Sequence, residues 1–179
     1  MVKYMNLKKV KVISIFGVFL ISFLSHFMYE WFPSVITSIF FPVNESIWEH
    51  MKIFTTSILI YSLIEYLILK KKKIYHNNFL LSTVVISILS VPIYLIIYLP
   101  LYKIFGEKMF ISIGLMFIVY AFMEYISYKI LQYKELNVNK YLLLTLLIIV
   151  YIIYTYLTYK PIKNYIFFDI KEKKYGITT

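Results

Sequence analysis

Five long apolar runs divide the chain. They cover roughly Val12–Met28, Ile53–Leu69, Phe79–Leu101, Met109–Leu131 and Tyr141–Tyr159. A helix needs about 20 residues to cross the hydrocarbon of a bilayer, and each run reaches that length with its interfacial ends. A helix also satisfies its own backbone hydrogen bonds, as bare lipid requires. The pattern predicts an all-α membrane bundle of five transmembrane helices, at about 12–32, 46–69, 79–101, 109–131 and 141–159.

The segment between the first two helices breaks this pattern. Pro33 and Pro42 bracket Ser34–Phe41, which is apolar but too short to span. Non-helical backbone at membrane depth is tolerated only against protein or a water-filled cavity. We therefore expect loop 33–43 to be re-entrant or interfacial and to pack over the bundle.

Two later segments also depart from simple spans. Pro92 and Pro100 interrupt the third run and predict a kink or an early end of that helix. The tail 160–179 contains the apolar stretch Tyr165–Phe168. Since this stretch is apolar enough to pack on the bundle, we expect the tail to dock.

Composition supports a membrane protein and excludes cysteine chemistry. The 179 residues are 61% hydrophobic, 20% aromatic and 16% charged, whereas a soluble domain carries about a quarter charged residues. No stretch is polar enough to cover a soluble core, so we interpret residues 1–179 as a single transmembrane domain. With no cysteine, disulfides, thiol nucleophiles and cysteine-based metal sites are excluded.

The charge distribution predicts an orientation. The formal net charge is +10, and the lysines lie between apolar runs, which favours contact with lipid headgroups over nucleic acid. Four lysines precede the first helix, and Lys70–Lys73 follow the second. The positive-inside rule then favours a cytoplasmic N-terminus and an outer C-terminus. The first run is long for a signal peptide and Phe23–Ser25 is a poor cleavage site, so we expect a retained helix.

Ionisable side chains gather on both sides of loop 33–43. The first helix ends with His26 and Glu30, four residues apart and so on one face. Glu49 and His50 lie just beyond the loop. Imidazole and carboxylate ligands suit zinc or another divalent ion with a position left open for water, and such an ion can drive hydrolysis. These four residues are the candidate metal ligands, and Glu49, His50 and Glu30 are the catalytic candidates.

The same block has a structural interpretation. Ser46-x-x-Glu49 is a capping-box pattern at a helix start, and a carboxylate there complements the helix dipole. His26 and Glu30 could equally be interfacial side chains. Asn44 and Glu45, together with Asp169 if the tail docks nearby, are candidates for binding a polar ligand.

A second set of polar residues lies inside the apolar runs. Tyr61 and Glu65 in the second helix and Tyr120 and Glu124 in the fourth share one spacing. A carboxylate in a span costs about 3 kcal/mol on insertion scales, so it should face the bundle and find a partner. Tyr61, Glu65 and Glu124 are ligand-binding candidates for a transporter or transporter subunit.

The competing interpretation of these glutamates is structural. Each lies one to two turns inside a basic boundary and could pair with Lys70 or Lys129, or with a neighbouring tyrosine. A third possibility is a non-catalytic scaffold that contacts lipid, a second copy of the chain or another membrane protein.

Several blocks resemble an uncharacterised family of small membrane proteins, found mainly in Firmicutes and described as a domain of unknown function. The resemblance covers nearly the whole chain and rests on His26–Trp31, Val43–Lys52, Ile64–Tyr66 and Phe168–Ile177. Its most specific part is Asn-Glu-Ser-x-x-Trp-Glu-His-x-Lys. Ile170 departs from the family pattern, where a proline usually follows the aspartate. The resemblance implies a multi-helix membrane protein with no established activity.

Overall fold

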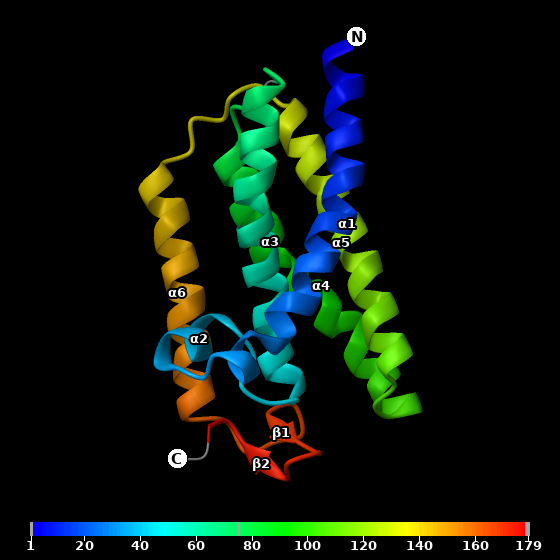
Figure 1. The fold of residues 1–179 in the computed structure, drawn as a ribbon, viewed down its shortest axis with the longest axis vertical. Coiled ribbons are helices and arrows are strands. Elements are labelled where there is room, and N and C mark those ends of the chain that lie inside the picture. The colour runs from blue at the N-terminus through cyan, green and yellow to red at the C-terminus, as the bar shows by residue number, and fades with distance from the viewer. Residues whose placement is uncertain (1, 75, 178–179) are drawn as a thin grey trace.

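The computed structural model describes residues 2–74 and 76–177, with side chains from residue 7 onward. The side chain of Lys3, part of the predicted basic segment, and the last two residues of the predicted tail lie outside the described residues. The described chain forms six helices and one two-stranded sheet (Figure 1), namely α1 (Val2–Trp31), α2 (Val35–Phe40), α3 (Ile47–Lys71), α4 (Phe79–Phe105), α5 (Met109–Gln132), α6 (Lys140–Tyr159), β1 (Phe168–Asp169) and β2 (Lys174–Tyr175).

Five of these helices are long and apolar enough to cross a membrane, which confirms the predicted fold class. They are α1, α3, α4, α5 and α6, and the protein is therefore a multi-pass membrane protein. The N-terminal end of α1 lies with the α3–α4 and α5–α6 connections at one end of the bundle (Figure 1). Loop 33–43, the α4–α5 turn and the C-terminal tail lie at the other end, called the loop end below. Helix α4 continues through Pro92 and Pro100 to Phe105, so the early end does not occur.

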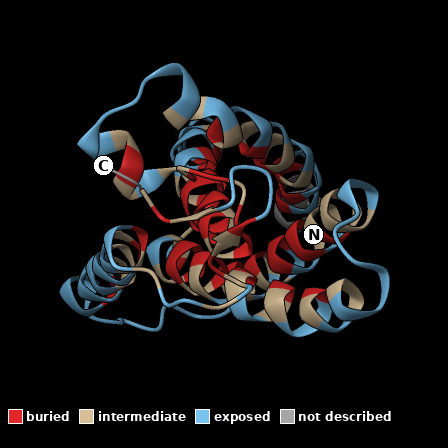
Figure 2. Ribbon diagram, turned by 90° about the horizontal axis from the view of Figure 1, so that it is seen from below, coloured by how far each residue is buried: buried red, intermediate tan, exposed pale blue. Residues whose placement is uncertain are grey.

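Helix α3 lies at the centre of the bundle and packs against α1, α4 and α6. Figure 2 shows the buried residues facing the middle, with exposed residues on the outer faces. The outer surface is nevertheless apolar, as Ile96 on α4, Phe110 on α5 and Ile152 on α6 are all exposed. An apolar exterior around a core with many serines and threonines fits a protein whose solvent is lipid.

The segment between α1 and α3 forms the short helix α2. Ser34 caps it, since its side chain accepts a hydrogen bond from the backbone of Thr37, and Thr37 returns the contact. The carbonyl of Phe40 at its end accepts a hydrogen bond from the Thr56 hydroxyl at 2.6 Å. Thr56 lies about 14 Å along α3 from Ile47 at 1.5 Å per residue. The segment therefore runs back along α3, as a re-entrant loop would.

The C-terminal tail docks on the loop end. The backbone N–H of Trp48 donates to the carbonyl of Ile166 at 2.9 Å. The indole of Trp48 also stacks on Phe167, with ring centroids 5.0 Å apart. Residues 168–175 form an antiparallel hairpin in which Phe168 pairs with Tyr175. The tail thus closes over the start of α3.

One close helix contact requires a glycine. Gly17 on α1 faces the ring of Tyr61 on α3, and a Cβ at Gly17 would overlap that ring. Tyr61 is buried, so its ring has little room to move away. Gly114 on α5 has no neighbour within 4 Å of an added Cβ.

We expect Gly17→Ala to destabilise the bundle by about 1–3 kcal/mol, because overpacking forces Tyr61 off its rotamer or α1 away from α3. Thermal unfolding in detergent measures this. Gly114→Ala is the matched control and should be neutral or stabilising, since alanine favours a helix by about 1 kcal/mol over glycine. Equal stability of the two variants would contradict the packing argument.

Candidate functional site

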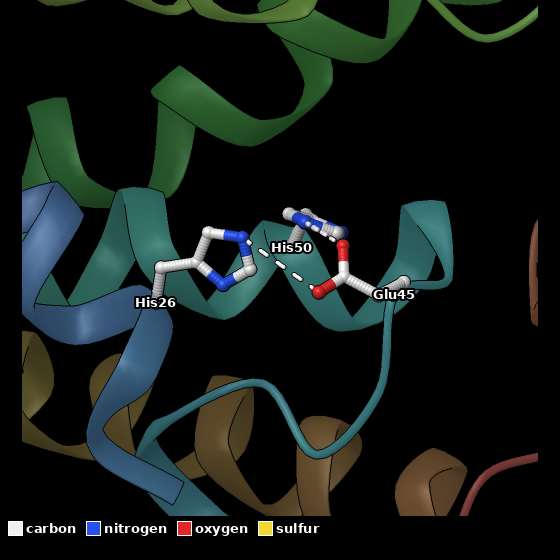
Figure 3. Close-up of side chains that lie close together, drawn as sticks. All are labelled: His26, Glu45 and His50. Carbon is white, nitrogen blue, oxygen red and sulfur yellow. Dashed lines mark ion pairs between the residues drawn. The ribbon is translucent and has the colours of Figure 1, made fainter. Parts of the chain in front are cut away.

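Three ionisable side chains converge at the loop end. His26 from α1, Glu45 from the loop before α3 and His50 from α3 each present a ligand atom, and these atoms lie within 4.8 Å of one another. The Nε2 of His26 is 3.8 Å from Oε1 of Glu45, and the Nε2 of His50 is 3.6 Å from Oε2. Figure 3 shows both imidazoles directed at the carboxylate. We call these three residues the His/Glu cluster.

The tautomer of His50 is fixed by its backbone contact. Its Nδ1 lies 2.8 Å from the carbonyl oxygen of Ser46, and a carbonyl can only accept. Nδ1 therefore carries the hydrogen, and in the neutral ring Nε2 keeps its lone pair toward Glu45. Metal-binding histidines usually have this arrangement, in which the second nitrogen is held by a carbonyl or carboxylate.

The tail positions Glu45. Its backbone N–H donates to Oδ2 of Asp169 at 2.9 Å. The other oxygen of Asp169 accepts from the backbone N–H groups of Lys171 and Glu172. Lys171 also brings its ammonium to 3.4 Å from Oε2 of Glu45. Asp169 thus lies near the cluster as a buried anchor for the Glu45 backbone.

A cavity of about 260 Å³ extends from the His/Glu cluster into the bundle. The walls come from α1, α3, α4, α5 and the tail. Most lining side chains are aromatic or aliphatic, and the charged ones beyond the cluster are Glu107 and Lys171. Tyr94, Tyr98 and Tyr102 form one wall, with neighbouring ring centroids 5.0 and 5.9 Å apart. The cluster therefore sits at the polar end of a mostly apolar chamber.

Two of the candidate metal ligands lie apart from this cluster. Glu30 is exposed near the end of α1, and Glu49 points into a different network. The carboxylate of Glu49 accepts hydrogen bonds from the Thr158 hydroxyl at 2.7 Å and from the backbone N–H of Val43 at 3.1 Å. It also pairs with the ammonium of Lys52 at 2.7 Å. Glu49 and His50 are adjacent in sequence, so they diverge around the helix.

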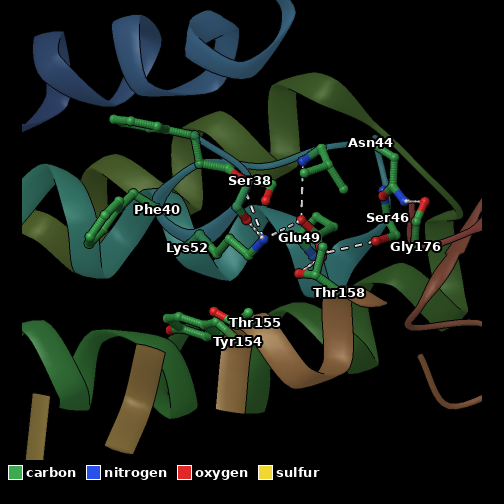
Figure 4. Close-up of polar contacts among 12 residues, drawn as sticks. Ser38, Phe40, Asn44, Ser46, Glu49, Lys52, Tyr154, Thr155, Thr158 and Gly176 are labelled. Carbon is green, nitrogen blue, oxygen red and sulfur yellow. Dashed lines mark hydrogen bonds and ion pairs between the residues drawn. The ribbon is translucent and has the colours of Figure 1, made fainter. Parts of the chain in front are cut away.

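Lys52 joins this network to the re-entrant segment. Its ammonium donates to the carbonyls of Ser38 at 2.7 Å and Phe41 at 3.4 Å, in addition to Glu49 (Figure 4). Lys52 is fully buried. A cation at the C-terminal end of a helix complements its dipole. Lys52 therefore neutralises the Glu49 carboxylate and also donates to backbone carbonyls at the end of α2.

The predicted capping box forms in part. Ser46 is the N-cap of α3 and accepts from the backbone N–H of Glu49. The backbone N–H of Ser46 donates to the side chain of Asn44 and not to Glu49. Asn44 also donates to the carbonyl of Gly176, which ties the tail to the loop. These contacts give Asn44 and Glu49 structural roles.

We expect Glu49→Gln to lower the free energy of unfolding by about 3–5 kcal/mol, because it leaves the buried Lys52 ammonium without its anion. Thermal unfolding in detergent measures the loss. Glu30→Gln is the control, because Glu30 is exposed, and it should change stability little. If both variants unfold at the wild-type temperature, Glu49 is not a structural anion.

Two further buried carboxylates, Glu65 and Glu124, share one partner. Lys11 on α1 forms ion pairs with Glu65 on α3 and with Glu124 on α5, the latter at 3.0 Å. The Ser14 hydroxyl donates to Glu65 at 3.1 Å. We call Lys11, Glu65 and Glu124 the Lys11 cluster, and all three are nearly fully buried. Tyr61 lies one turn from Glu65 and packs on Gly17.

The partner of these glutamates differs from the two lysines considered in the sequence. Lys70 and Lys129 are exposed, whereas Lys11 lies on another helix. A contact across 54 or 113 positions leaves no local signal in the sequence. The same holds for Glu107 and Lys171, which became site candidates only through the cavity.

We expect Lys11→Met to destabilise the bundle by about 3–5 kcal/mol, because two carboxylates would then lie buried without a cation. Unfolding in detergent again provides the measurement. Lys8→Met serves as control, since Lys8 is exposed. Adding Glu65→Gln and Glu124→Gln to Lys11→Met should restore part of the loss. A Lys11→Met variant as stable as Lys8→Met would argue against the pairing.

Comparison with known proteins yields a family without an assigned activity. The model of a family of unknown function, DUF6512, matches residues 1–177. This match confirms that the chain resembles an uncharacterised family over almost its whole length, while the Firmicutes distribution and the signature motif stay predictions. Searches of curated proteins and of solved structures find no match.

Proposed function

The chain belongs to this family of unknown function, and we propose from the geometry of its site that it is a membrane-embedded, metal-dependent hydrolase. His26, Glu45 and His50 bind one divalent ion, with zinc as the best match. The observation that carries the proposal is the convergence of three ligand atoms within 4.8 Å at the mouth of a cavity.

The three side chains lie close enough to bind one metal ion once they move closer together. Ligand atoms bound tetrahedrally to zinc at about 2.0–2.1 Å lie roughly 3.4 Å apart. The two separations from Glu45 are 3.6 and 3.8 Å, each to a different carboxylate oxygen, and the three ligand atoms lie within 4.8 Å of one another. Binding one ion would therefore draw these atoms together by up to about 1.4 Å, which side-chain rotation can supply. Two histidines and one glutamate are also the ligand set of a class of zinc hydrolases, which leave a fourth position open for water.

The open side of the cluster determines the chemistry. When bound, the ion would supply an activated water and polarise a carbonyl or phosphoryl oxygen for hydrolysis. His50 is oriented for this by Ser46, and Glu45 by Asp169. Glu107, the second carboxylate that lines the cavity, is the candidate to accept a proton there.

The two alternatives gain less support. A transporter using Glu65 and Glu124 would need those carboxylates in contact with a water-filled path, yet both are buried and paired with Lys11. A non-catalytic scaffold predicts that the His/Glu cluster only stabilises the fold. The metal experiment below separates that scaffold from the hydrolase.

The lysine distribution extends the proposal to location. Lys8 and Lys9 near the start of α1, and Lys70–Lys73 around the end of α3, belong to the end of the bundle opposite the cluster. If the positive-inside rule holds, the N-terminus is cytoplasmic and the site opens on the outer face, with the C-terminal tail.

Purified protein should contain about one zinc ion per chain, the stoichiometry of a single three-residue site. We expect His26→Ala, His50→Ala and Glu45→Gln each to lower zinc affinity by at least about 100-fold, because removing a ligand costs more than the 10–100-fold of an outer-shell change. Elemental analysis and a competing chelator measure this. Zinc content should also fall at acidic pH, since protons compete for the ligand atoms.

The chain provides matched controls for both ligand types. His76, the third histidine, lies after α3, where its Nδ1 contacts the carbonyl of Ile74. His76→Ala and Glu30→Gln should leave zinc binding unchanged. Absence of bound metal from every preparation, or equal losses in the controls, would overturn the metal site and leave the scaffold.

A further inference from the structure

We infer that the cavity beside the His/Glu cluster binds a single-chain amphiphile with an anionic headgroup, so that the substrate class is lipid-like. This inference rests on the proposed function, because it assigns the headgroup to the metal-binding end. It also assigns the apolar part of the bound molecule, which the metal-binding residues alone do not reveal.

The cavity reaches well into the helix bundle. The deepest lining residues on four helices lie seven to eleven positions from the helix end at the loop end, and they are Ser22, Phe54, Tyr94 and Met116. At 1.5 Å per residue this corresponds to roughly 10–16 Å. His50 lies only one turn from the start of α3. The chamber therefore leads from a polar mouth to the level of the membrane hydrocarbon.

The chemistry of the walls changes along this depth. The mouth carries His26, Glu45 and His50, whereas the deep end is formed by side chains such as Phe54, Tyr94 and Met116. A small polar substrate would leave the deep end without a complementary partner. An acyl chain can lie against these apolar walls while its polar head stays at the cluster, so chain and head both contribute to the affinity.

The volume limits the number of chains. About 260 Å³ lies just below the roughly 300–1,000 Å³ typical of small-ligand pockets. A space below the usual range favours one alkyl chain over the two chains of a bilayer phospholipid. The ligand is therefore a single-chain amphiphile.

The charge at the mouth selects the headgroup. Lys171 lies 3.4 Å from Glu45 with its side chain 62% exposed, so it can reach a ligand at the cluster. Further lysines occur in the same tail, at 160, 163, 173 and 174. With a divalent ion on the cluster, the mouth is positive and favours a phosphate or carboxylate head.

The test uses zinc-loaded full-length protein in phosphatidylcholine nanodiscs, with dodecyl phosphate as the probe. We expect saturable binding at one site, at least tenfold weaker binding of ethyl phosphate, which lacks the chain, and no saturable binding of dodecyltrimethylammonium. Equal binding of the phosphate and the ammonium would overturn the assignment of the head.

Variants on α5 test the position of the chain. Met116→Trp fills the deep end and should weaken dodecyl phosphate binding at least tenfold without changing zinc content. Ile118→Trp is the control, because Ile118 is 62% exposed on the outer face of the same helix. Unchanged binding in Met116→Trp would refute the cavity as the site. A series from ethyl to hexadecyl phosphate tests the same point without mutation, since affinity should stop rising once the chain fills the cavity, and a continuous rise would count against it.

Zinc content, measured on the same samples, separates the two proposals. Bound zinc without saturable dodecyl phosphate binding refutes the inference and leaves the metal site. Dodecyl phosphate binding that is weakened in Met116→Trp, in protein without zinc, supports the amphiphile cavity and refutes the metal-dependent function.

Discussion

The loop end depends on one buried cation, the ammonium of Lys52. A re-entrant segment presents backbone carbonyls at a depth where water is scarce, and unsatisfied carbonyls there cost several kcal/mol. Lys52 donates to the carbonyls of Ser38 and Phe41 and to the carboxylate of Glu49. All three of its donors are thereby used. This single residue neutralises a buried anion and ends α2 at the same point.

The consequences of that interaction reach the candidate site. Glu49 accepts from Val43 and Thr158, so the ion pair fixes the loop to both α3 and α6. The next residues of the loop carry Glu45, whose backbone is held in turn by Asp169. The position of the Glu45 carboxylate beside two histidines therefore follows from contacts that involve no histidine. Glu49 and His50 join different groups because adjacent positions on α3 are rotated by about 100° around the helix axis.

The sequence predicts the membrane helices well, but it does not predict which charged side chains pair with one another. Apolar length reveals the five helices, and the prolines at 33 and 42 mark the re-entrant segment. The block Asn44–His50 is recognisable as unusual, and Ser46 as a helix cap. Which carboxylate turns toward His26 is decided by where α3 begins and how α6 approaches, so Glu45 and Glu49 could not be distinguished. The pairing of Lys11 with two distant glutamates depends on tertiary packing alone.

The contrast between the ionic groups argues for a function at one of them. Glu49 with Lys52, and Lys11 with its two glutamates, are almost fully buried and make contacts of hydrogen-bond length. The charges in these two groups are already paired, so a ligand could bind there only if existing ion pairs were broken. The side chains of His26, Glu45 and His50 are 29–31% exposed, and their mutual contacts of 3.6 and 3.8 Å exceed hydrogen-bond distance. They converge without satisfying one another, and they border a cavity, so this is the group whose electrostatics a bound ion would complete.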